Sequence, residues 1–169
     1  MTGISALLLE RIKKEVNHVF LVYGGAIAPL VERIPESGLK YVCPMHEQSA
    51  SFMAEGYAKV HGFGVAISTS GPGAHNMVTG IANCYYDSTP CLFITGQVAR
   101  NLMRPDESFR QVGFQETPIT EIVRPITKYA ATVMDPAQAL PMLDMAIYIA
   151  RSGRPGPVLI DLPVDIQKC

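Results

Sequence analysis

The sequence has little charge and no long apolar run that would cross a membrane. Charged residues make up 17% of the 169 residues, the net charge is −1, and no basic run occurs. Such a weak field does not attract nucleic acid or an anionic membrane, so neither partner is expected. The N-terminus lacks the basic start and cleavage site of a signal peptide, and Glu10 and Arg11 end its apolar stretch. We therefore expect a cytoplasmic protein.

The common signatures of metal sites, disulfides and nucleotide loops are also missing. His46 does not begin a zinc helix, because Ala50 stands where the second histidine would be. No GxGxxG motif, Walker lysine or Ser–His–Asp set is present. The cysteines form no CxxC pair and predict buried thiols rather than disulfides or zinc ligands; they are Cys43, Cys84, Cys91 and Cys169. No residue of this chain is therefore expected to bind a metal.

Short apolar runs alternate with helical patterns along the whole chain. Strands are expected over 18–23, 39–44, 64–70, 90–96, 126–134 and 157–163. Helices are expected over 4–16, 26–34, 46–61, 71–83 and 135–153. Pro35 is expected to stop the second helix, and Pro141 to kink the last one or mark its start. The third helix is expected to bury Phe52, Met53, Gly56, Tyr57 and Val60. This alternation predicts an α/β fold with a parallel sheet covered on both faces.

Three strand ends carry unusual residues: YGGA (23–26), PMHEQ (44–48) and STSGPGAHN (68–76). Ligands of parallel sheets bind beyond the carboxyl ends of the strands, so these segments are expected to open onto one rim. A long polar segment runs from Gln97 to Gln115. Loops of that length in compact domains are often functional.

Glu47 is the first candidate for chemistry, because it lies in the first turn of a long helix, just after a strand. A helix N-terminus stabilises a carboxylate, whereas burial among apolar groups favours its protonated form. A carboxyl group under both influences is suited to sharing a proton with a ligand nitrogen. Taken alone, Glu47 is more simply explained as a favourable first-turn acid.

The remaining candidates are individually weak. Gly24-Gly25 and the SGPG turn (70–73) let a ligand approach the backbone, but tight turns required by the fold explain them equally well. His75 is better explained as a hydrogen-bonded helix residue than as a base. Asn76 and Gln97 are polar residues near strand ends. Phe114 either packs on a ligand or belongs to the core, and Gln115 is placed to hydrogen-bond a ligand.

Taken together, the motifs resemble the N-terminal, pyrimidine-binding domain of thiamine-diphosphate-dependent enzymes, most closely the acetolactate synthase branch. The resemblance rests on VYGGAIAPLVERI, HEQSASFMAEGYAKVHG, STSGPGAHNMVTGIANCYYDSTPCLFITGQV, GFQETPITEIVRPITKYA and SGRPGPVLIDLPVDIQ, which follow one another in this order. It covers nearly the whole chain. It implies a flavodoxin-like three-layer sandwich with six parallel strands, forming one domain over residues 1–169.

The resemblance also implies the roles of several residues. The family's glutamate, which matches Glu47, hydrogen-bonds the ring nitrogen N1′ of the cofactor's aminopyrimidine and promotes loss of the proton on C2 of the thiazolium. The residues that match the family's pyrimidine site are Gly24, Gly25, Ala26, Gly73 and Asn76. Phe114 and Gln115 match a pair that faces the substrate, and Lys128 matches a lysine near the pocket entrance. The hard chemistry belongs to the cofactor.

The sequence departs from the family pattern in two ways. Tyr23 stands where the family usually has a proline before the paired glycines, which leaves the branch and the substrate open. The GDG motif, which holds the diphosphate and magnesium in a separate domain, does not occur, and the middle domain is also absent. We therefore expect the chain to be inactive alone. It is either a fragment or one subunit of a split enzyme, and its exposed rim favours a homo-oligomer or hetero-oligomer with a diphosphate-binding partner.

The activity implied is that of a transferase or lyase of the acetolactate synthase type, in branched-chain amino acid biosynthesis. It would decarboxylate pyruvate and transfer the two-carbon unit to a second 2-keto acid. Thiamine diphosphate is the implied cofactor, with Mg²⁺ in the partner domain, and FAD is also compatible. The alternatives are a decarboxylase or acetyltransferase for another keto acid or a sulfonated substrate, a non-catalytic assembly module, and an unrelated flavodoxin-like nucleotide binder.

Overall fold

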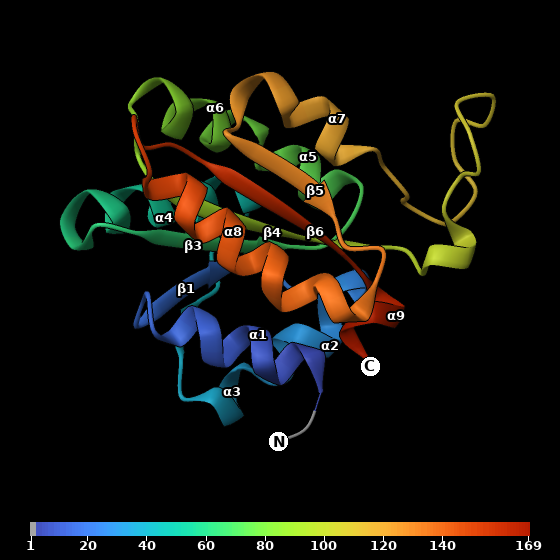
Figure 1. Ribbon diagram of the computed structural model, residues 1–169, viewed down its shortest axis with the longest axis horizontal. Coiled ribbons are helices and arrows are strands. Elements are labelled where there is room, and N and C mark those ends of the chain that lie inside the picture. The colour runs from blue at the N-terminus through green and yellow to red at the C-terminus, as the bar shows by residue number, and fades with distance from the viewer. Residues whose placement is uncertain (1–2) are drawn as a thin grey trace.

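A single sheet of six parallel strands runs through the computed structural model, which describes residues 3–169 (Figure 1). The strands are β1 (His18–Leu21), β2 (Lys40–Val42), β3 (Gly64–Ser68), β4 (Cys91–Gln97), β5 (Tyr129–Thr132) and β6 (Val158–Pro163). Their order across the sheet is β2-β1-β3-β4-β6-β5, and each neighbouring pair is parallel. The predicted α/β class with six parallel strands is confirmed.

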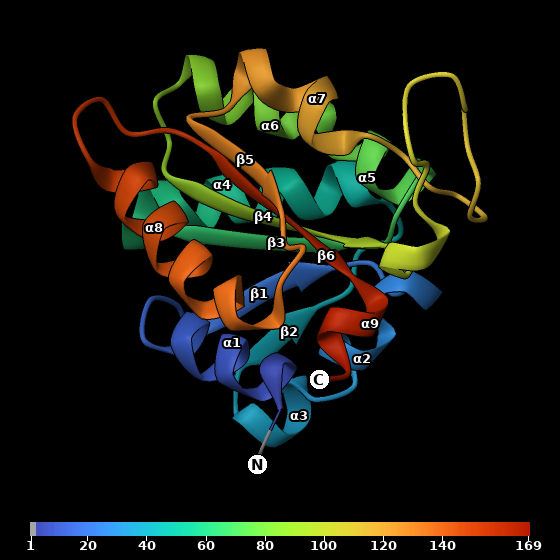
Figure 2. The ribbon, with the colours of Figure 1, turned by 45° about the vertical axis from the view of Figure 1, so that its right-hand side comes forward.

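Helices cover both faces of the sheet and give the three layers seen in Figures 1 and 2. One face carries α1 (Ile4–Lys13), α2 (Ala28–Val31), α3 (Ile34–Ser37), α8 (Ala139–Arg151) and α9 (Val164–Gln167). The other carries α4 (Glu47–His61), α5 (Pro72–Asn76), α6 (Val78–Tyr86) and α7 (Ile119–Val123). Short 3₁₀ turns are η1 (Gly25–Ile27), η2 (Arg100–Leu102), η3 (Arg124–Ile126) and η4 (Pro136–Gln138). A separate apolar cluster fills each interface between helices and sheet.

Burial along the strands explains why they read as continuous apolar runs. Every residue of β3, β4 and β6 is buried, because helices lie above and below these central strands. The edge strands differ: β2 is exposed throughout and β5 is half-buried. Since all six strands are parallel, their carboxyl ends lie at one edge of the sheet, which we call the carboxyl edge.

Helix α4 buries the face opposite to the one expected. Its buried residues are Ala50, Ser51, Ala54, Glu55 and Ala58. Phe52, Met53 and Val60 are 41%, 40% and 76% exposed, and only Tyr57 of the predicted buried side packs against the core. Small side chains let α4 lie close to the sheet: a Cβ added at Gly64 of β3 would be 2.0 Å from the backbone oxygen of Ala54. The large apolar side chains therefore face outward.

Two prolines lie at the starts of helices rather than at their ends. Pro35 is in the first turn of α3, so the predicted single helix over 26–34 is divided into η1, α2 and α3. Pro141 lies in the first turn of α8, which begins at Ala139. Proline is tolerated there because the first backbone N–H groups of a helix have no intrahelical partner. Of the two expectations for Pro141, a kink or the start of the helix, the second agrees with its position two residues after Ala139.

Candidate functional site

The three unusual strand ends meet at the carboxyl edge of the sheet, as expected. The backbone N–H of Ala26, after β1, donates to Oγ1 of Thr69, after β3, over 3.2 Å. A Cβ added at Gly24 would lie 2.4 Å from the Cβ of Thr69, so only glycine allows this approach. The loop after β2 leads into Glu47, which contacts the helix that follows β3. Loops from three adjacent strands thus form one rim.

Glu47 is the first residue of α4 and is half-buried. The preceding residue, His46, caps the helix: its Nδ1 accepts a hydrogen bond from the backbone N–H of Gln48 over 3.1 Å. On Glu47 itself, Oε2 accepts a hydrogen bond of 2.9 Å from Nδ2 of Asn76. Across residues 3–169, no side chain or backbone group donates to Oε1. One carboxylate oxygen is therefore held and the other is free.

Two glycines of the rim differ in the space around them. A Cβ added at Gly73 would lie 3.3 Å from Oε1 of Glu47 and 2.8 Å from Cγ2 of Thr69. A Cβ added at Gly25 would meet nothing within 4 Å. Gly73 is buried, and its backbone packs so closely on the carboxylate and Thr69 that a side chain has no room there, whereas the Gly25 side of the rim is open. A free carboxylate oxygen beside an open glycine turn is suited to a ligand with a basic ring nitrogen.

Gln167 supports the glycine turn from behind. Its Oε1 accepts from the backbone N–H of Leu30 over 3.3 Å, and its Nε2 donates over 2.7 Å to the backbone oxygens of Ala26 and Leu162. The side chain is 2% exposed. It therefore joins β6, α2 and the glycine turn. The sequence analysis did not identify this residue, and its signal, a glutamine after an apolar strand, is not specific.

Phe114 and Gln115 lie at the end of the long loop and differ in their contacts. Phe114 is 85% exposed, so the alternative that it belongs to the core is wrong. Gln115 has φ 61°, in the left-handed region, and Gly71 has φ 57°. A Cβ added at Gly71 would lie 2.8 Å from the Cβ of Gln115. The backbone of Gln115 therefore packs directly on the SGPG turn.

His75 and Gln97 are held in a polar network beneath this loop. Nε2 of His75 lies 2.6 Å from Oγ1 of Thr117. Nε2 of Gln97 donates to the backbone oxygen of Thr117 over 2.8 Å and to Oδ2 of Asp161 over 3.1 Å. Gln97 is 1% exposed. His75 is thus a hydrogen-bonded helix residue, as the sequence favoured, and Gln97 anchors the loop to the sheet.

Asp161 is a buried acid that the sequence analysis missed. It lies within β6 and accepts hydrogen bonds from Oγ1 of Thr95 (2.7 Å), Nε2 of Gln97 and Oγ1 of Thr132 (3.1 Å). Burial raises the pKa of Asp161 to about 7, although the three hydrogen bonds favour its charged form. The signal was available, because a lone acid in the apolar strand VLIDLP must either find partners or hold a proton.

Lys128 does not join the other candidates. It directly precedes β5 and therefore lies at the amino edge of the sheet, opposite Glu47. Its Nζ donates to the backbone oxygen of Ile149 over 2.5 Å and to that of Ser152, at the end of α8. Burial lowers the pKa of Lys128. A cation at the C-terminus of a helix is favourable, and the expected place of Lys128 near the pocket entrance stays a prediction.

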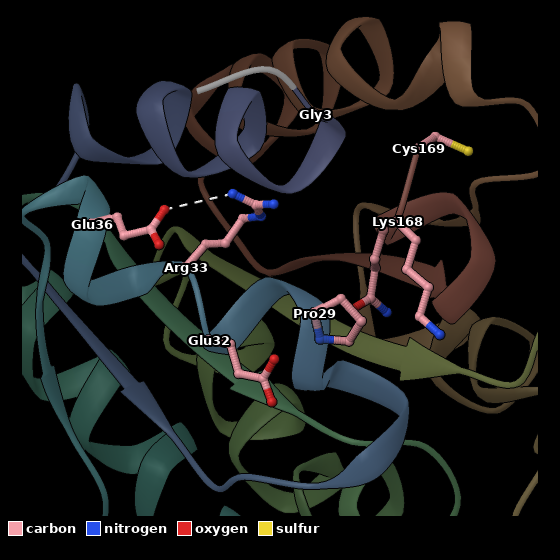
Figure 3. A pocket seen from close by; sticks show the side chains of 8 residues that line it. Gly3, Pro29, Glu32, Arg33, Glu36, Lys168 and Cys169 are labelled. Carbon is pink, nitrogen blue, oxygen red and sulfur yellow. Dashed lines mark ion pairs between the residues drawn. The ribbon is translucent and has the colours of Figure 1, made fainter.

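One cavity of the described residues lies away from the rim that holds Glu47. It has a volume of about 430 Å³ and lies between α2, α3 and the end of the chain (Figure 3). Its walls carry an ion pair, Arg33 to Glu36 at 3.5 Å, and are formed by Gly3, Pro29, Glu32, Arg33, Glu36, Gln167, Lys168 and Cys169. None of the candidate residues lies in it.

Two further observations concern groups of metal-ligating side chains and the cysteines. Within residues 3–169 there is no group of three or more His, Cys, Asp and Glu side chains suited to a metal ion. The cysteines are free: Cys84 and Cys91 are buried as expected, whereas Cys43 and Cys169 are exposed. No helix in the same range is long and apolar enough to cross a membrane.

The chain is similar to proteins with a common cofactor. Residues 2–123 match the family described as "Thiamine pyrophosphate enzyme, N-terminal TPP binding domain". The chain is 47% identical over 167 residues to acetolactate synthase 2, chloroplastic, of Nicotiana tabacum, a match over 97% of this chain and 24% of the tobacco protein. It is 44% identical over 169 residues to the acetolactate synthase large subunit of Lactococcus lactis subsp. lactis (strain IL1403), covering 98% and 28%.

These similarities cover only one part of the related proteins. A third relative, the acetolactate synthase of Arthrospira platensis, is 42% identical over an alignment of 171 residues that covers 98% of this chain and 28% of that protein. The chain thus spans about a quarter of the length of these curated relatives. The family match covers well over half of this chain, and the fold agrees with it. The chain therefore belongs to the thiamine pyrophosphate enzymes, within their N-terminal TPP-binding domain family.

Proposed function

We propose that this chain is the pyrimidine-binding half of a thiamine-diphosphate enzyme of the acetolactate synthase type. One observation carries the proposal: Asn76 holds Oε2 of Glu47 and leaves Oε1 free, close to the buried backbone of Gly73. A carboxylate whose only role is to stabilise the start of a helix does not require a neighbouring glycine or a hydrogen bond from an amide of another helix. The similarity to acetolactate synthases over nearly the whole chain supports the same assignment.

Each residue of the rim would make a different contact with a bound aminopyrimidine. Glu47 would hold a proton between Oε1 and the ring nitrogen, and Asn76 would fix the orientation of the carboxylate. Gly24, Gly25 and Ala26 would line one side of the ring, and Gly73 the other. When bound, thiamine diphosphate supplies the carbon nucleophile that decarboxylates a 2-keto acid. The contribution of this chain is position and proton transfer.

The substrate side of the site would be formed by Phe114 and Gln115. Phe114 is exposed and presents an apolar ring, while Gln115 presents an amide from a fixed backbone next to Gly71. A small 2-keto acid offers both an apolar methyl group and polar oxygens to such a pair. The proposed reaction decarboxylates pyruvate and transfers the two-carbon unit to a second 2-keto acid.

A partner domain would complete the site. The large apolar residues on the outer face of α4, together with Tyr86 of α6, form an exposed surface that we call the α4 face: Phe52, Met53, Val60 and Tyr86. Exposed apolar surface of this kind marks protein interfaces. We propose that a diphosphate-binding domain, carried by the rest of a longer chain or by another subunit, packs there and holds Mg²⁺. We assign no residue of this chain to a flavin.

A second candidate function is the same chemistry on another keto acid or a sulfonated substrate. Tyr23, which precedes the paired glycines, is 56% exposed, and its hydroxyl donates to Oε1 of Glu32 over 3.0 Å. This hydrogen bond holds a bulky side chain beside the glycine turn. There it would reduce the space through which a substrate reaches the site. A substrate panel on the assembled enzyme decides between the two. Exclusive formation of acetolactate from pyruvate rejects the second candidate.

The deciding experiment measures acetolactate formation from pyruvate with thiamine diphosphate and Mg²⁺. This chain is assayed alone and then together with its diphosphate-binding domain, and activity is expected only in the second case. Glu47→Gln should lower kcat by about 100-fold or more, because it removes the proton-transfer group. Glu36→Gln, an exposed acid of α3, serves as the matched control. Near-normal turnover of Glu47→Gln would reject the proposal.

The cytoplasmic location is a separate prediction. Finding the protein in another compartment would contradict it.

A further inference from the structure

We infer that Glu116 is a positioning residue, which fastens the arm formed by residues 103–113 and thereby sets the conformation of Phe114 and Gln115. This inference rests on the proposed function, in which those two residues face the substrate. The arm projects from the body of the domain in both ribbon views, as the yellow segment of Figures 1 and 2. Without a fastening, a projecting segment of this length would not hold the residue that follows it in one conformation.

The side chain of Glu116 hydrogen-bonds to both ends of the arm. Its Oε1 accepts from the backbone N–H of Arg104 over 2.5 Å, and its Oε2 accepts from the backbone N–H of Val112 over 2.8 Å. Glu116 is only 7% exposed, so little water competes for either oxygen. Hydrogen bonds from N–H groups to a charged carboxylate are stronger than those between neutral groups. A single carboxylate thus closes the base of the arm.

Further contacts close the same point. The N–H of Gly113 donates to the backbone oxygen of Leu102 over 2.9 Å, and the N–H of Glu116 donates to that of Gly113 over 3.1 Å. Nε2 of Gln111 donates to the backbone oxygen of Glu116 over 2.9 Å. A Cβ added at Gly113 would lie 3.0 Å from the oxygen of Leu102. The two ends of the arm therefore lie in close contact where the arm joins the domain.

The neighbours of Glu116 connect this fastening to the site. Gln115, directly before it, is in the left-handed region and packs on Gly71. Thr117, directly after it, contacts His75 and Gln97. A non-glycine residue stays in the left-handed region only when its surroundings hold it there. Glu116 holds Gln115 from the arm side and Thr117 holds it from the sheet side.

Removal of the carboxylate should therefore change substrate recognition before it changes cofactor binding. In Glu116→Ala the two arm N–H groups lose their acceptor, and Gln115 is free to return to a common backbone conformation. The KM for the keto acid should rise by about tenfold, the effect of one charge-assisted hydrogen bond, while the affinity for thiamine diphosphate stays unchanged. Glu116→Gln keeps one acceptor oxygen and should give a smaller rise.

The test uses the assembled enzyme and a double-mutant cycle. If Glu116 acts through its neighbours, Glu116→Ala should raise KM in the wild-type background but not in a Phe114→Ala/Gln115→Ala background. Glu121→Gln, an exposed acid near the arm that pairs with Arg104 at 3.4 Å, is the matched control. An unchanged KM in Glu116→Ala, or equal effects in both backgrounds, would overturn the inference.

Hydrogen exchange separates this inference from the proposed function. If the assembled enzyme consumes no keto acid, the proposed function fails, but the amide of Val112 still reports on the fastening. Its exchange should accelerate by about tenfold or more in Glu116→Ala and stay unchanged in Glu121→Gln. Equal exchange of Val112 in Glu116→Ala and in the wild type would overturn the fastening itself.

Discussion

Asn76 of α5 donates a hydrogen bond of 2.9 Å to Oε2 of Glu47, at the start of α4. The two residues are 29 positions apart in the sequence and follow different strands of the sheet. Their contact makes the carboxylate asymmetric, because one oxygen is occupied and the other is free. A proton donor or acceptor on a ligand therefore meets Oε1 in a fixed orientation, which is the arrangement that proton transfer requires.

Asn76→Ala should weaken binding of thiamine diphosphate to the assembled enzyme by about tenfold, because the carboxylate loses a charge-assisted hydrogen bond. Asn76→Asp should weaken it further, since two carboxylates would then lie side by side. Calorimetric titration measures both. Asn83→Ala removes a similar bond, from Nδ2 to Oε2 of Glu55 at 2.7 Å, away from the site, and should leave the affinity unchanged. Wild-type affinity in Asn76→Ala would contradict this prediction.

Gly73→Ala should abolish cofactor binding without unfolding the domain. The new methyl group would lie 3.3 Å from Oε1 of Glu47 and 2.8 Å from Cγ2 of Thr69. Adding Thr69→Ser removes the second clash and keeps the hydroxyl that accepts from Ala26. The double variant should therefore recover thermal stability but not cofactor affinity. Recovery of both would show that Gly73 matters only for packing.

Gly64→Ala should destabilise the domain by about 2–4 kcal/mol, because the added Cβ would lie 2.0 Å from the backbone oxygen of Ala54. Gly56→Ala is the matched control: its Cβ meets nothing within 4 Å, and alanine favours a helix interior by about 0.5–1 kcal/mol. Urea unfolding of the two variants should shift the midpoint in opposite directions. A Gly64→Ala midpoint equal to that of the wild type would mean that α4 is not seated closely on β3.

The stability of the domain should depend on the proton of Asp161. Its pKa is about 7 in the folded chain and near the ordinary 3.8 when unfolded. Between these values the unfolded chain releases a proton that the folded chain keeps, so the free energy of unfolding falls as pH rises and levels off above about 7. The amide in Asp161→Asn cannot lose a proton in this way, so the fall in the free energy of unfolding between pH 4 and 8 should be a few kcal/mol smaller in this variant than in the wild type. Unfolding from pH 4 to 8 checks it: parallel curves for the two proteins would refute the assignment.

Phe52→Ser combined with Val60→Ser should weaken association through the α4 face by about tenfold or more, because buried apolar anchors dominate interfaces. Leu7→Ser, an exposed leucine of α1 on the other face, is the matched control. Sedimentation of this domain with its diphosphate-binding partner measures the effect. Equal loss in both variants would place the interface elsewhere.

Strand positions and helix faces differ in how well the sequence predicts them. The apolar runs located all six strands, and the position of the glycines and Glu47 after those strands placed them correctly at one rim. The face of α4 was predicted wrongly, because large apolar residues are equally expected at a core and at an interface. The burial of Ala50 and Ala54 reflects the close approach of Gly64, which local periodicity does not reveal.

The boundaries of the strands were predicted less well than their positions. The predicted strand over 126–134 includes Lys128, whereas β5 begins one residue after it, at Tyr129. The place of Lys128 near the pocket entrance was implied by the family resemblance alone and stays a prediction. The bonds of Glu116 to Arg104 and Val112 were beyond prediction, because they depend on the path of an irregular loop.

Gln167 has a consequence for how this domain can be divided. The residue is two positions before Cys169, yet it holds the backbone of Ala26 and Leu30, next to the paired glycines. A chain shortened to Pro163 would keep the residues of all six strands, but the turn after β1 would lose this support. The position of the paired glycines therefore depends on a segment that lies beyond the last strand of the sheet.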